Sequence, residues 1–469
     1  MTGSTTSAAT TQGFNTVRVI HLAVVAAIGG FLFGFDTAVI NGAVTAMQSD
    51  FAMGDTLTGF VVSSALLGCM VGAYAAGRIA DRIGRIRVML LASAMFTISG
   101  LGSGLAFGPV DMIIWRVVGG LGVGAASVIA PAYIAEISPA EVRGRMGSLQ
   151  QLAIVVGIFL ALLSDFAIAG AAGGSTQQWA LGLEAWRWMF LAELVPAVAY
   201  GVLAATIPES PRYLVRIGQE GQARTVLGSI LRSGVDLRIS EIKRTITQEA
   251  RTSFADLKKP GGGLLPIVWI GIALSVFQQF VGINVIFYYS SMLWQSVGFT
   301  EEDALLQTVI TSVTNIVVTL VAIALVDKIG RRVLLIIGSG GMTVSLAVMA
   351  FVFSQATIVD GAPQLSDSAS VTALIAANAF VVFFGATWGP VVWVLLGEMF
   401  NNTIRGTALG LAAAAQWLAN FAISTSFPDM AEVGLWFAYG FYTLCAFLSL
   451  LFVLKFVPET KGIELEDMS

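Results

Sequence analysis

The chain has 469 residues, of which 56% are hydrophobic and only 12% charged, against roughly a quarter charged in an ordinary soluble domain. Apolar runs recur along its whole length, and many reach the ~18 residues that a helix needs to cross a bilayer. The net charge is -4 and the basic residues are grouped by loop, so no positive groove indicates a nucleic-acid partner.

Few side chains suited to catalysis are present. His21 is the only histidine, and Cys69 and Cys445 both lie in apolar runs, where a free thiol behaves as a small hydrophobe. This argues against zinc sites, histidine-based catalysis and a disulfide framework, and the sequence contains no Walker phosphate loop. We therefore expect neither an enzyme nor an ATP-driven pump, and no metal or other cofactor.

The chain begins with a polar stretch, MTGSTTSAATTQGFNT, and the apolar run after it is too long for the core of a signal peptide. We expect a disordered cytoplasmic tail and then twelve membrane helices, which makes an all-α integral membrane protein. The candidate spans are 20–47, 56–80, 87–107, 109–135, 147–168, 187–207, 264–296, 305–326, 333–355, 370–399, 406–427 and 433–456.

Basic residues mark one side of the membrane. They gather in the short connections after spans two, four, eight and ten and in the middle segment 208–263, while the opposite connections are mainly acidic, with Arg187 as the basic exception. By the positive-inside rule both termini and the middle segment are cytoplasmic. The sequence thus predicts a multi-pass protein of the plasma membrane, which in a bacterium is the inner membrane, and we expect it to work as a monomer.

The middle segment is the only sizeable soluble piece. Residues 219–251 have the pattern of short amphipathic helices, and KKPGGG at 258–263 ends them. The predicted organisation is a tail 1–18, a six-helix bundle 19–207, a cytoplasmic helical linker 208–263, a second six-helix bundle 264–456 and a tail 457–469.

The two halves of the chain resemble each other weakly. The matching segments are DRIGR at 81–85 with DKIGR at 327–331, EISPAEVRG at 136–144 with EMFNNTIRG at 398–406, and FGFD at 33–36 with VGIN at 281–284. Halves related by internal symmetry are typical of transporters, with the substrate site between them near the middle of the bilayer.

These segments belong to a longer series of motifs that resembles one family, the sugar porters of the major facilitator superfamily. The motifs are GGFLFGFDTAVING at 29–42, GRIADRIGR at 77–85, WRVVGGLGVGAASVIAPAYIAEISPAEVRGR at 115–145, PESPRYL at 208–214, QQFVGINVIFYYS at 278–290, WGPVVWVLLGEMF at 388–400, AQWLAN at 415–420 and PETKG at 458–462. The likeness is greatest to bacterial glucose transporters that use the proton gradient. It implies the major facilitator fold, alternating access and a central site for a pyranose.

Asp36 lies mid-way along the first predicted span and Arg116 near the start of the fourth. Such residues are costly in a membrane and are functional candidates. Arg116, Gly120, Gly124 and Ser127 share one helix face whose small residues allow a neighbour to approach, and we expect that neighbour to be the first span. A paired Asp36 stays ionised, and burial favours its protonated form once the pair breaks. The alternative is an ion pair that merely locks two helices.

The internal repeat favours the proton switch. Asp36 corresponds to Asn284, and Arg116 corresponds to Asn378, so only the first half carries charges at these positions. The resemblance agrees, because proton-coupled members of the family carry Asp at the position of Asp36 while facilitators tend to carry Asn.

Amides suit the hydroxyls of a sugar and indoles suit its apolar face. The second half supplies both, in Gln278, Gln279, Asn284, Tyr288, Asn315, Trp388, Trp393, Gln416, Trp417 and Asn420. Gln279 and Asn284 are five residues apart, so both point inward only if the helix breaks at Gly282. The alternative for each amide is a hydrogen bond between helices.

The resemblance implies a narrower set of sugar contacts. It comprises Gln151, Gln278, Gln279, Asn284, Asn315, Trp393, Gln416 and Trp417, with Gly389 allowing the ligand close to span ten. Some proton-coupled relatives have a second Gln where this chain has Ile158, which leaves the exact sugar open. Tyr288 and Tyr289 are candidates for an outer gate, although they and Trp388 fit a packing role equally well.

Charges also recur at the cytoplasmic helix ends. The candidates are Asp81, Arg82, Arg85, Glu136 and Arg143, their second-half counterparts Asp327, Lys328, Arg331, Glu398 and Arg405, and in addition Arg145, Glu209, Arg212 and Glu459. We expect them to form a network that joins the halves while the inner side is closed. The alternative is that they only fix orientation and cap helices.

The predicted function is import of a monosaccharide, D-glucose, driven by protons. The alternatives are a passive sugar facilitator and a symporter for another hexose, a pentose or a cyclic polyol. A drug antiporter would have a more apolar pocket, and a sugar sensor would usually carry a long signalling tail.

Overall fold

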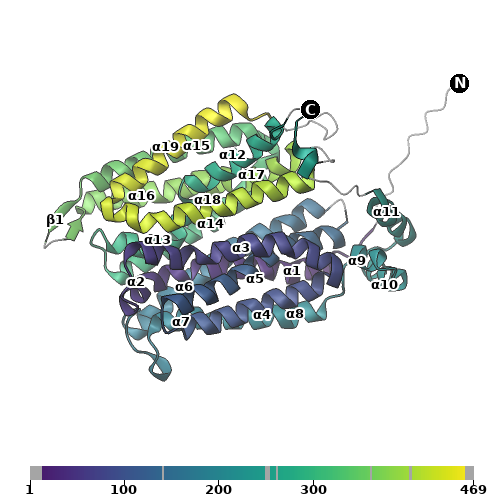
Figure 1. The fold of residues 1–469 in the computed structure, drawn as a ribbon, viewed down its shortest axis with the longest axis horizontal. Coiled ribbons are helices and arrows are strands. Elements are labelled where there is room, and N and C mark those ends of the chain that lie inside the picture. Colours follow the sequence, from purple (N-terminus) through teal and green to yellow (C-terminus); the bar gives the residue numbers. More distant parts are fainter. Residues whose placement is uncertain are drawn as a thin grey trace.

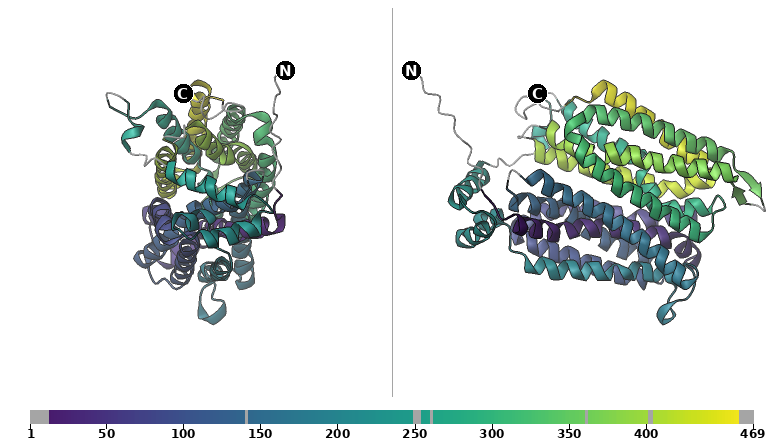
Figure 2. Two further views of the ribbon diagram at one scale, coloured as in Figure 1. Left: turned by 90° about the vertical axis from the view of Figure 1, so that its right-hand side faces the viewer. Right: turned by 180° about the vertical axis from the view of Figure 1, so that it is seen from behind.

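The computed structural model describes residues 13–139, 142–248, 254–259, 262–359, 362–400 and 404–459. Nearly all of them are helical, and the long helices form two bundles that lie one above the other in Figure 1, the first half purple to blue and the second half green to yellow. The bundles run in the same direction, which the view from behind also shows (Figure 2).

The first bundle contains six spans, two of which are interrupted by one residue. Its elements are α1 (Thr16–Ala38), α2 (Ile40–Asp50), α3 (Asp55–Ile83), α4 (Arg85–Gly104), α5 (Pro109–Ile137), α6 (Arg143–Ala172), the 3₁₀ turn η1 (Ala180–Gly182), α7 (Ala185–Ala192) and α8 (Leu194–Thr206). Three short helices and a 3₁₀ turn follow as the linker. They are α9 (Pro211–Arg216), α10 (Glu220–Ile230), α11 (Val235–Gln248) and η2 (Phe254–Leu257).

The second bundle repeats the pattern. Its elements are α12 (Pro266–Phe280), α13 (Ile283–Gln295), α14 (Glu301–Ile329), α15 (Arg331–Ser354), the strands β1 (Thr357–Val359) and β2 (Ala362–Gln364), α16 (Asp367–Phe383), the π-helix η3 (Phe384–Trp388), α17 (Gly389–Met399), α18 (Arg405–Val433) and α19 (Leu435–Phe456). The strands pair antiparallel in a small hairpin, with Ile358 opposite Pro363.

The helices agree with the twelve predicted spans. Among the described residues, eleven segments are long and apolar enough to cross a membrane. The remaining predicted span is α18, which has 29 residues and is less apolar because it carries Gln416 and Asn420 among its serines and threonines. The all-α membrane fold is therefore confirmed.

The N-terminal tail is shorter than predicted. Residues 1–12 lie outside the described part, but α1 begins at Thr16 and the residues before it pair with the linker. Asn15 donates its N–H to the carbonyl of Ile230 at 2.8 Å, and Arg232 donates to the carbonyl of Gly13 at 2.9 Å. Asn15 also caps α1 through its side chain, so residues 13–18 are ordered by backbone pairing and capping that composition alone does not reveal.

Small residues bring the helices of the first bundle into close contact. A Cβ on Gly120 would lie 1.9 Å from the carbonyl oxygen of Ala65 on α3, and one on Gly124 would lie 2.2 Å from that of Cys69. The glycines of this face of α5 therefore pack on α3 and not, as predicted, on the first span, although Arg116 of the same face does meet the first span. The prediction failed because helix pairing depends on how both helices are rotated, and the sequence of one helix does not fix that rotation.

The two ends of the molecule differ. The end that carries α9, α10 and α11 is called the linker end here, and the opposite end, with α2, η1 and the β1–β2 hairpin, is called the loop end (Figure 1). Arg187, the basic residue that departed from the charge pattern, lies at the loop end and is neutralised there. It pairs with Asp50 at 2.7 Å and with Glu184 at 3.2 Å.

Hydrogen bonds join the two bundles in the part of the interface nearer the loop end. Ser63 of α3 shares one with Thr425 of α18 at 2.6 Å, and Thr56 donates to Asp429 at 2.7 Å. The backbones are equally close, because a Cβ on Gly59 would lie 2.2 Å from the carbonyl oxygen of Thr425. The bundles are thus closed against each other at the loop end.

Candidate functional site

Asp36 and Arg116 meet in the interior of the first bundle, as predicted. Arg116 of α5 donates from Nη1 to the Asp36 carboxylate at 3.2 Å and to the Asp36 carbonyl at 3.0 Å. Their side chains are 0% and 2% exposed, so the pair is shielded from bulk solvent. Asp36 Oδ2 and Arg116 Nε have no hydrogen-bond partner in the described part of the chain, so a single nitrogen of Arg116 makes both contacts to Asp36.

A third ionisable residue, which the sequence analysis missed, lies beside this pair. Glu193 is the single residue between α7 and α8, is fully buried, and interacts electrostatically with both Asp36 and Arg116. Neither of its carboxyl oxygens has a hydrogen-bond partner among the described residues. The signal was available, because an acidic residue inside the sixth span meets the same criterion that singled out Asp36.

The seventh span breaks where predicted. Gly282 has φ +83°, a conformation that glycine adopts without strain, and it separates α12 from α13. A Cβ there would lie 2.7 Å from the Tyr442 ring. The break lets Asn284 at the start of α13 donate to Gln279 near the end of α12 at 2.6 Å.

The predicted amides form one connected chain. Gln279 donates to Gln278 Oε1 at 3.4 Å, and Gln416 of α18 donates to the same oxygen at 2.5 Å. Gln278 itself donates to the carbonyl of Trp388 at 3.0 Å. The Oε1 atom of Gln416 is buried without a partner in the described residues, so the chain ends in an acceptor that a sugar hydroxyl can use.

The π-helix η3 lies against this chain. Gln278 also reaches the carbonyl of Gly389, at 3.3 Å, directly after η3. Asn315 of α14 faces the same turn, since its Oδ1 would lie 3.3 Å from a Cβ on Gly385. A single π turn widens a helix and exposes its carbonyls, which here supplies acceptors next to the amides. A Cβ on Gly389 would meet only ordinary contacts, the nearest at 3.4 Å.

The remaining predicted sugar contacts are more scattered. Trp417 of α18 lies 5.8 Å, centroid to centroid, from the ring of Phe33 on α1, so it bridges the two bundles. Gln151 is partly buried on α6. Trp393 of α17 is 44% exposed, and the described contacts do not bring it to the amide chain.

Three aromatic candidates have packing contacts. Trp388 is fully buried and donates to the carbonyl of Leu335 at 3.1 Å and to Ser339 Oγ at 3.0 Å, which ties η3 to α15. Tyr289 donates to the carbonyl of Ser424 at 2.8 Å, and Asn420 donates to the Tyr288 hydroxyl at 3.5 Å. Both tyrosines thus hold α13 to α18 within the second bundle.

The charged motifs form two matching clusters at the linker end, one in each half. Arg85 makes two bonds to Glu136, at 2.8 and 3.0 Å, and Arg331 makes two to Glu398, at 2.8 and 3.1 Å. In each half a second glutamate caps the helix that begins with this arginine, which is α4 in the first half and α15 in the second.

Glu209 performs this capping in the first half and Glu459 in the second. Glu209 accepts from the backbone N–H of Arg85 at 3.0 Å, as Glu459 does from Arg331 at 3.0 Å. The glycines before these helices, Gly84 and Gly330, both have positive φ and leave room for the carboxylates. Glu209 of PESPR in the first half and Glu459 of PETKG in the second therefore have the same structural role.

The first-half cluster extends into the linker. Asp81 pairs with Arg85 at 3.3 Å and with Arg216 at 2.7 Å, and the Arg82 carbonyl accepts from the Tyr213 hydroxyl at 3.1 Å. Arg145 is exposed. The side chains of Asp327 and Arg405, also predicted members, lie outside the described part.

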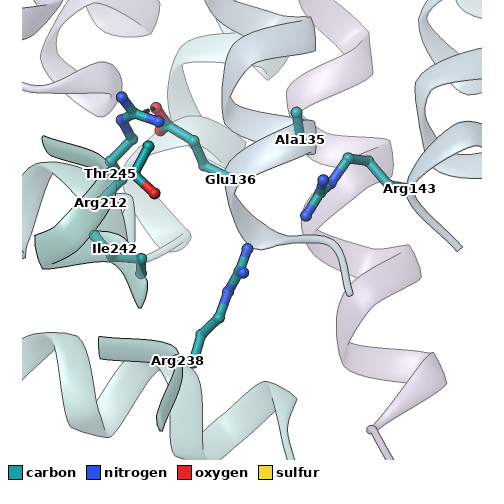
Figure 3. Close-up of a pocket in the computed structure, with 7 residues that line it drawn as sticks. All are labelled: Ala135, Glu136, Arg143, Arg212, Arg238, Ile242 and Thr245. Atoms are coloured by element: carbon teal, nitrogen blue, oxygen red, sulfur yellow. Dashed lines mark ion pairs between the residues drawn. The ribbon is translucent and has the colours of Figure 1, made fainter. Parts of the chain in front are cut away.

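A cavity of about 300 Å³ lies beside this cluster (Figure 3). Its wall combines the end of α5, the start of α6 and the linker helices α9 and α11, and Arg212 reaches Glu136 there at 4.0 Å. Its lining residues are Ala135, Glu136, Arg143, Arg212, Arg238, Ile242 and Thr245. The cavity is at the linker end and away from the amide chain.

Comparison with known proteins decides the family. The family model described as sugar (and other) transporter matches residues 22–469. The chain belongs to this family. The transporter is 59% identical over 456 residues to the glucose transport protein of Synechocystis sp., covering 97% of both chains. It is 38% identical over 493 residues to the D-xylose-proton symporter of Escherichia coli, covering 97% of this chain and 96% of the relative.

The transporter's fold also matches solved structures. It is similar to the xylose transporter XylE from E. coli in an inward-open conformation, with a TM-score of 0.80, 37% identity and coverage of 96% of this chain and 99% of that one. That likeness agrees with the closed loop end of the present structure.

Proposed function

We propose that the transporter imports a hexose, D-glucose, together with a proton. The proposal rests on the different polar groups in the two bundles. The first bundle contains a buried ion pair, Asp36 with Arg116. The second contains a chain of amides that ends in Gln416 Oε1, a buried acceptor without a partner among the described residues. Relatives named as a glucose transport protein and as a D-xylose-proton symporter support both the sugar and the proton.

The linker end is taken to face the cytoplasm. Positive charge gathers there, on the linker and the short connections, which is the pattern of cytoplasmic loops. Both termini then lie inside, and the loop end faces outward. With the loop end closed, we assign the structure to the inward-facing part of the transport cycle.

The proton cycle follows from the geometry of the pair. Arg116 reaches the Asp36 carboxylate by one nitrogen, so a small movement of α5 against α1 breaks the contact. A buried carboxylate without its cation favours the protonated form. Opening of the loop end would then load Asp36 from outside, and reformation of the pair with the linker end open would release the proton inside.

The test is uptake of labelled D-glucose into proteoliposomes with and without a pH gradient, acid outside. Accumulation above equilibrium that collapses with a protonophore is expected. Competition by D-xylose, D-galactose and a cyclic polyol identifies the substrate. Uptake that only equilibrates and ignores the protonophore would make the protein a passive facilitator, and failure of every sugar to compete would overturn the proposal.

A further inference from the structure

A further buried carboxyl packs against the first span and lies outside both the ion pair and the chain of amides. Asp165 of α6 is fully buried and accepts a hydrogen bond from the backbone N–H of Gly42 at 3.2 Å. Its other oxygen, Oδ1, has no partner among the described residues. A carboxyl inside a membrane span is costly, so its presence asks for a role.

The carboxylate oxygen Oδ2 of Asp165 accepts its hydrogen bond at the start of helix α2. The first span is interrupted at Val39, and α2 begins at Ile40. The first N–H groups of a helix lack partners within it. Val39, the residue before α2, has an apolar side chain and makes no capping hydrogen bond. Asp165 satisfies one of these groups from the neighbouring helix α6.

Glycine at position 42 permits this contact. A Cβ there would lie 2.6 Å from the Asp165 Cβ and 2.7 Å from its Oδ2. The carboxyl therefore rests directly on the α2 backbone, and it fixes the position of that helix start relative to α6.

The residue before Gly42 joins the two bundles. Asn41 is fully buried, and its Nδ2 donates to the Phe287 carbonyl at 3.0 Å and to Ser290 Oγ at 2.9 Å. Its Oδ1 accepts from the Ser291 N–H at 3.1 Å, and the Ser291 hydroxyl donates to the Asn41 carbonyl. All these partners lie on α13 in the second bundle, close to the loop end.

We propose that Asp165 is a positioning residue for closure of the loop end. Its acceptor oxygen holds the start of α2 at the height and rotation at which Asn41 meets α13. The role lies in the hydrogen bond and not in the charge, so a neutral amide can fill it. Asp165 acts through α2, without contact to the sugar or to Asp36. The inference rests on alternating access in the proposed function, but its test needs neither sugar nor proton.

The experiment is hydrogen–deuterium exchange of the purified full-length transporter in lipid nanodiscs. Asp165→Leu keeps the approximate volume and loses the acceptor, and we expect exchange in α2 and α13 to rise about fivefold, as for one lost hydrogen bond. Asp165→Asn keeps an acceptor, and we expect it to match the wild type. Ser164→Ala is the matched control, because the Ser164 hydroxyl bonds only its own helix, to the Ala161 carbonyl at 2.8 Å.

A double variant tests whether Asp165 works through Asn41. Asn41→Ala should raise exchange in the same two helices, and adding Asp165→Leu should add nothing further. Should the Leu variant fail to fold, Gly42→Ala replaces it, since its Cβ would push the carboxyl away. Equal rises in the Asn and Leu variants, a rise spread over all helices, or additive effects with Asn41→Ala would each overturn the proposal.

Discussion

At the scale of single residues, the proposed mechanism assigns proton coupling to the ion pair of the first bundle and sugar binding to the amides of the second. Asp36→Asn removes the titratable group but keeps its size and a carbonyl that Arg116 can bond. We predict loss of uphill glucose accumulation, with exchange of labelled sugar at equilibrium retained, because the amides lie in the other bundle. Paired measurements of gradient-driven uptake and of counterflow in proteoliposomes check this. Undiminished uphill uptake by the variant would contradict it.

Gln416 is the residue on which sugar affinity should depend most directly. It donates to Gln278 and keeps one buried oxygen without a partner. For Gln416→Leu we predict a KM raised about 5- to 30-fold, since one or two hydrogen bonds to the sugar are lost. Counterflow kinetics give the value. Asn378→Leu is the matched control, because that amide bonds the Leu374 carbonyl and Thr314 away from the chain of amides, and a similar loss there would argue against a specific role for Gln416.

At the scale of elements, the break between α12 and α13 positions the amide chain. Gly282→Ala adds a Cβ at positive φ, which costs an ordinary residue roughly 1–2 kcal/mol, and it also meets the Tyr442 ring. We predict that Asn284 then moves away from Gln279 and that sugar affinity falls, while the purified protein stays folded. Equilibrium binding by tryptophan fluorescence checks this. The control is Gly340→Ala on α15, where a Cβ meets nothing within 4 Å.

The same elements show what the sequence could and could not provide. The spacing of Gln279 and Asn284 predicted the Gly282 break, because five residues of unbroken helix would point the two amides in different directions and both can face the interior only if the helix breaks between them. The packing of α5 on α3 was not predictable from the glycines of α5 alone. Glu193 could have been singled out as an acidic residue inside the sixth span, but its position beside Arg116, at the junction of α7 and α8, emerges only when the helices are assembled.

At the scale of the whole molecule, the internal repeat was predictable from the sequence, but the contacts that close each end of the two bundles were not. The paired motifs at 81–85 and 327–331 indicated two related halves, and the structure gives each half the same Arg–Glu pair and the same capping glutamate. Which contacts close which end depends on the distance between the bundles, and that distance has no local signal in the sequence. Asn41, with its bonds to α13, is an example.

The charge clusters at the linker end should set the balance between the two open states. The contacts described for each cluster lie within its own half, and the sequence predicts that its charges bridge the halves when the linker end is closed. Glu398→Gln removes one charge from a partly exposed pair, which contributes about 1 kcal/mol or less. We therefore predict a shift of up to about fivefold toward the state with the linker end open, with sugar binding retained, measured by exchange in α5, α6 and α17 and by equilibrium binding. Glu136→Gln should act in the same direction, because the clusters are related by the repeat.

Asp367→Asn is the control, because Asp367 is an exposed acidic residue at the loop end. It should change neither the balance between the two open states nor sugar binding. Loss of binding with the balance unchanged would mean that the clusters serve the sugar site and not the transition between its two sides.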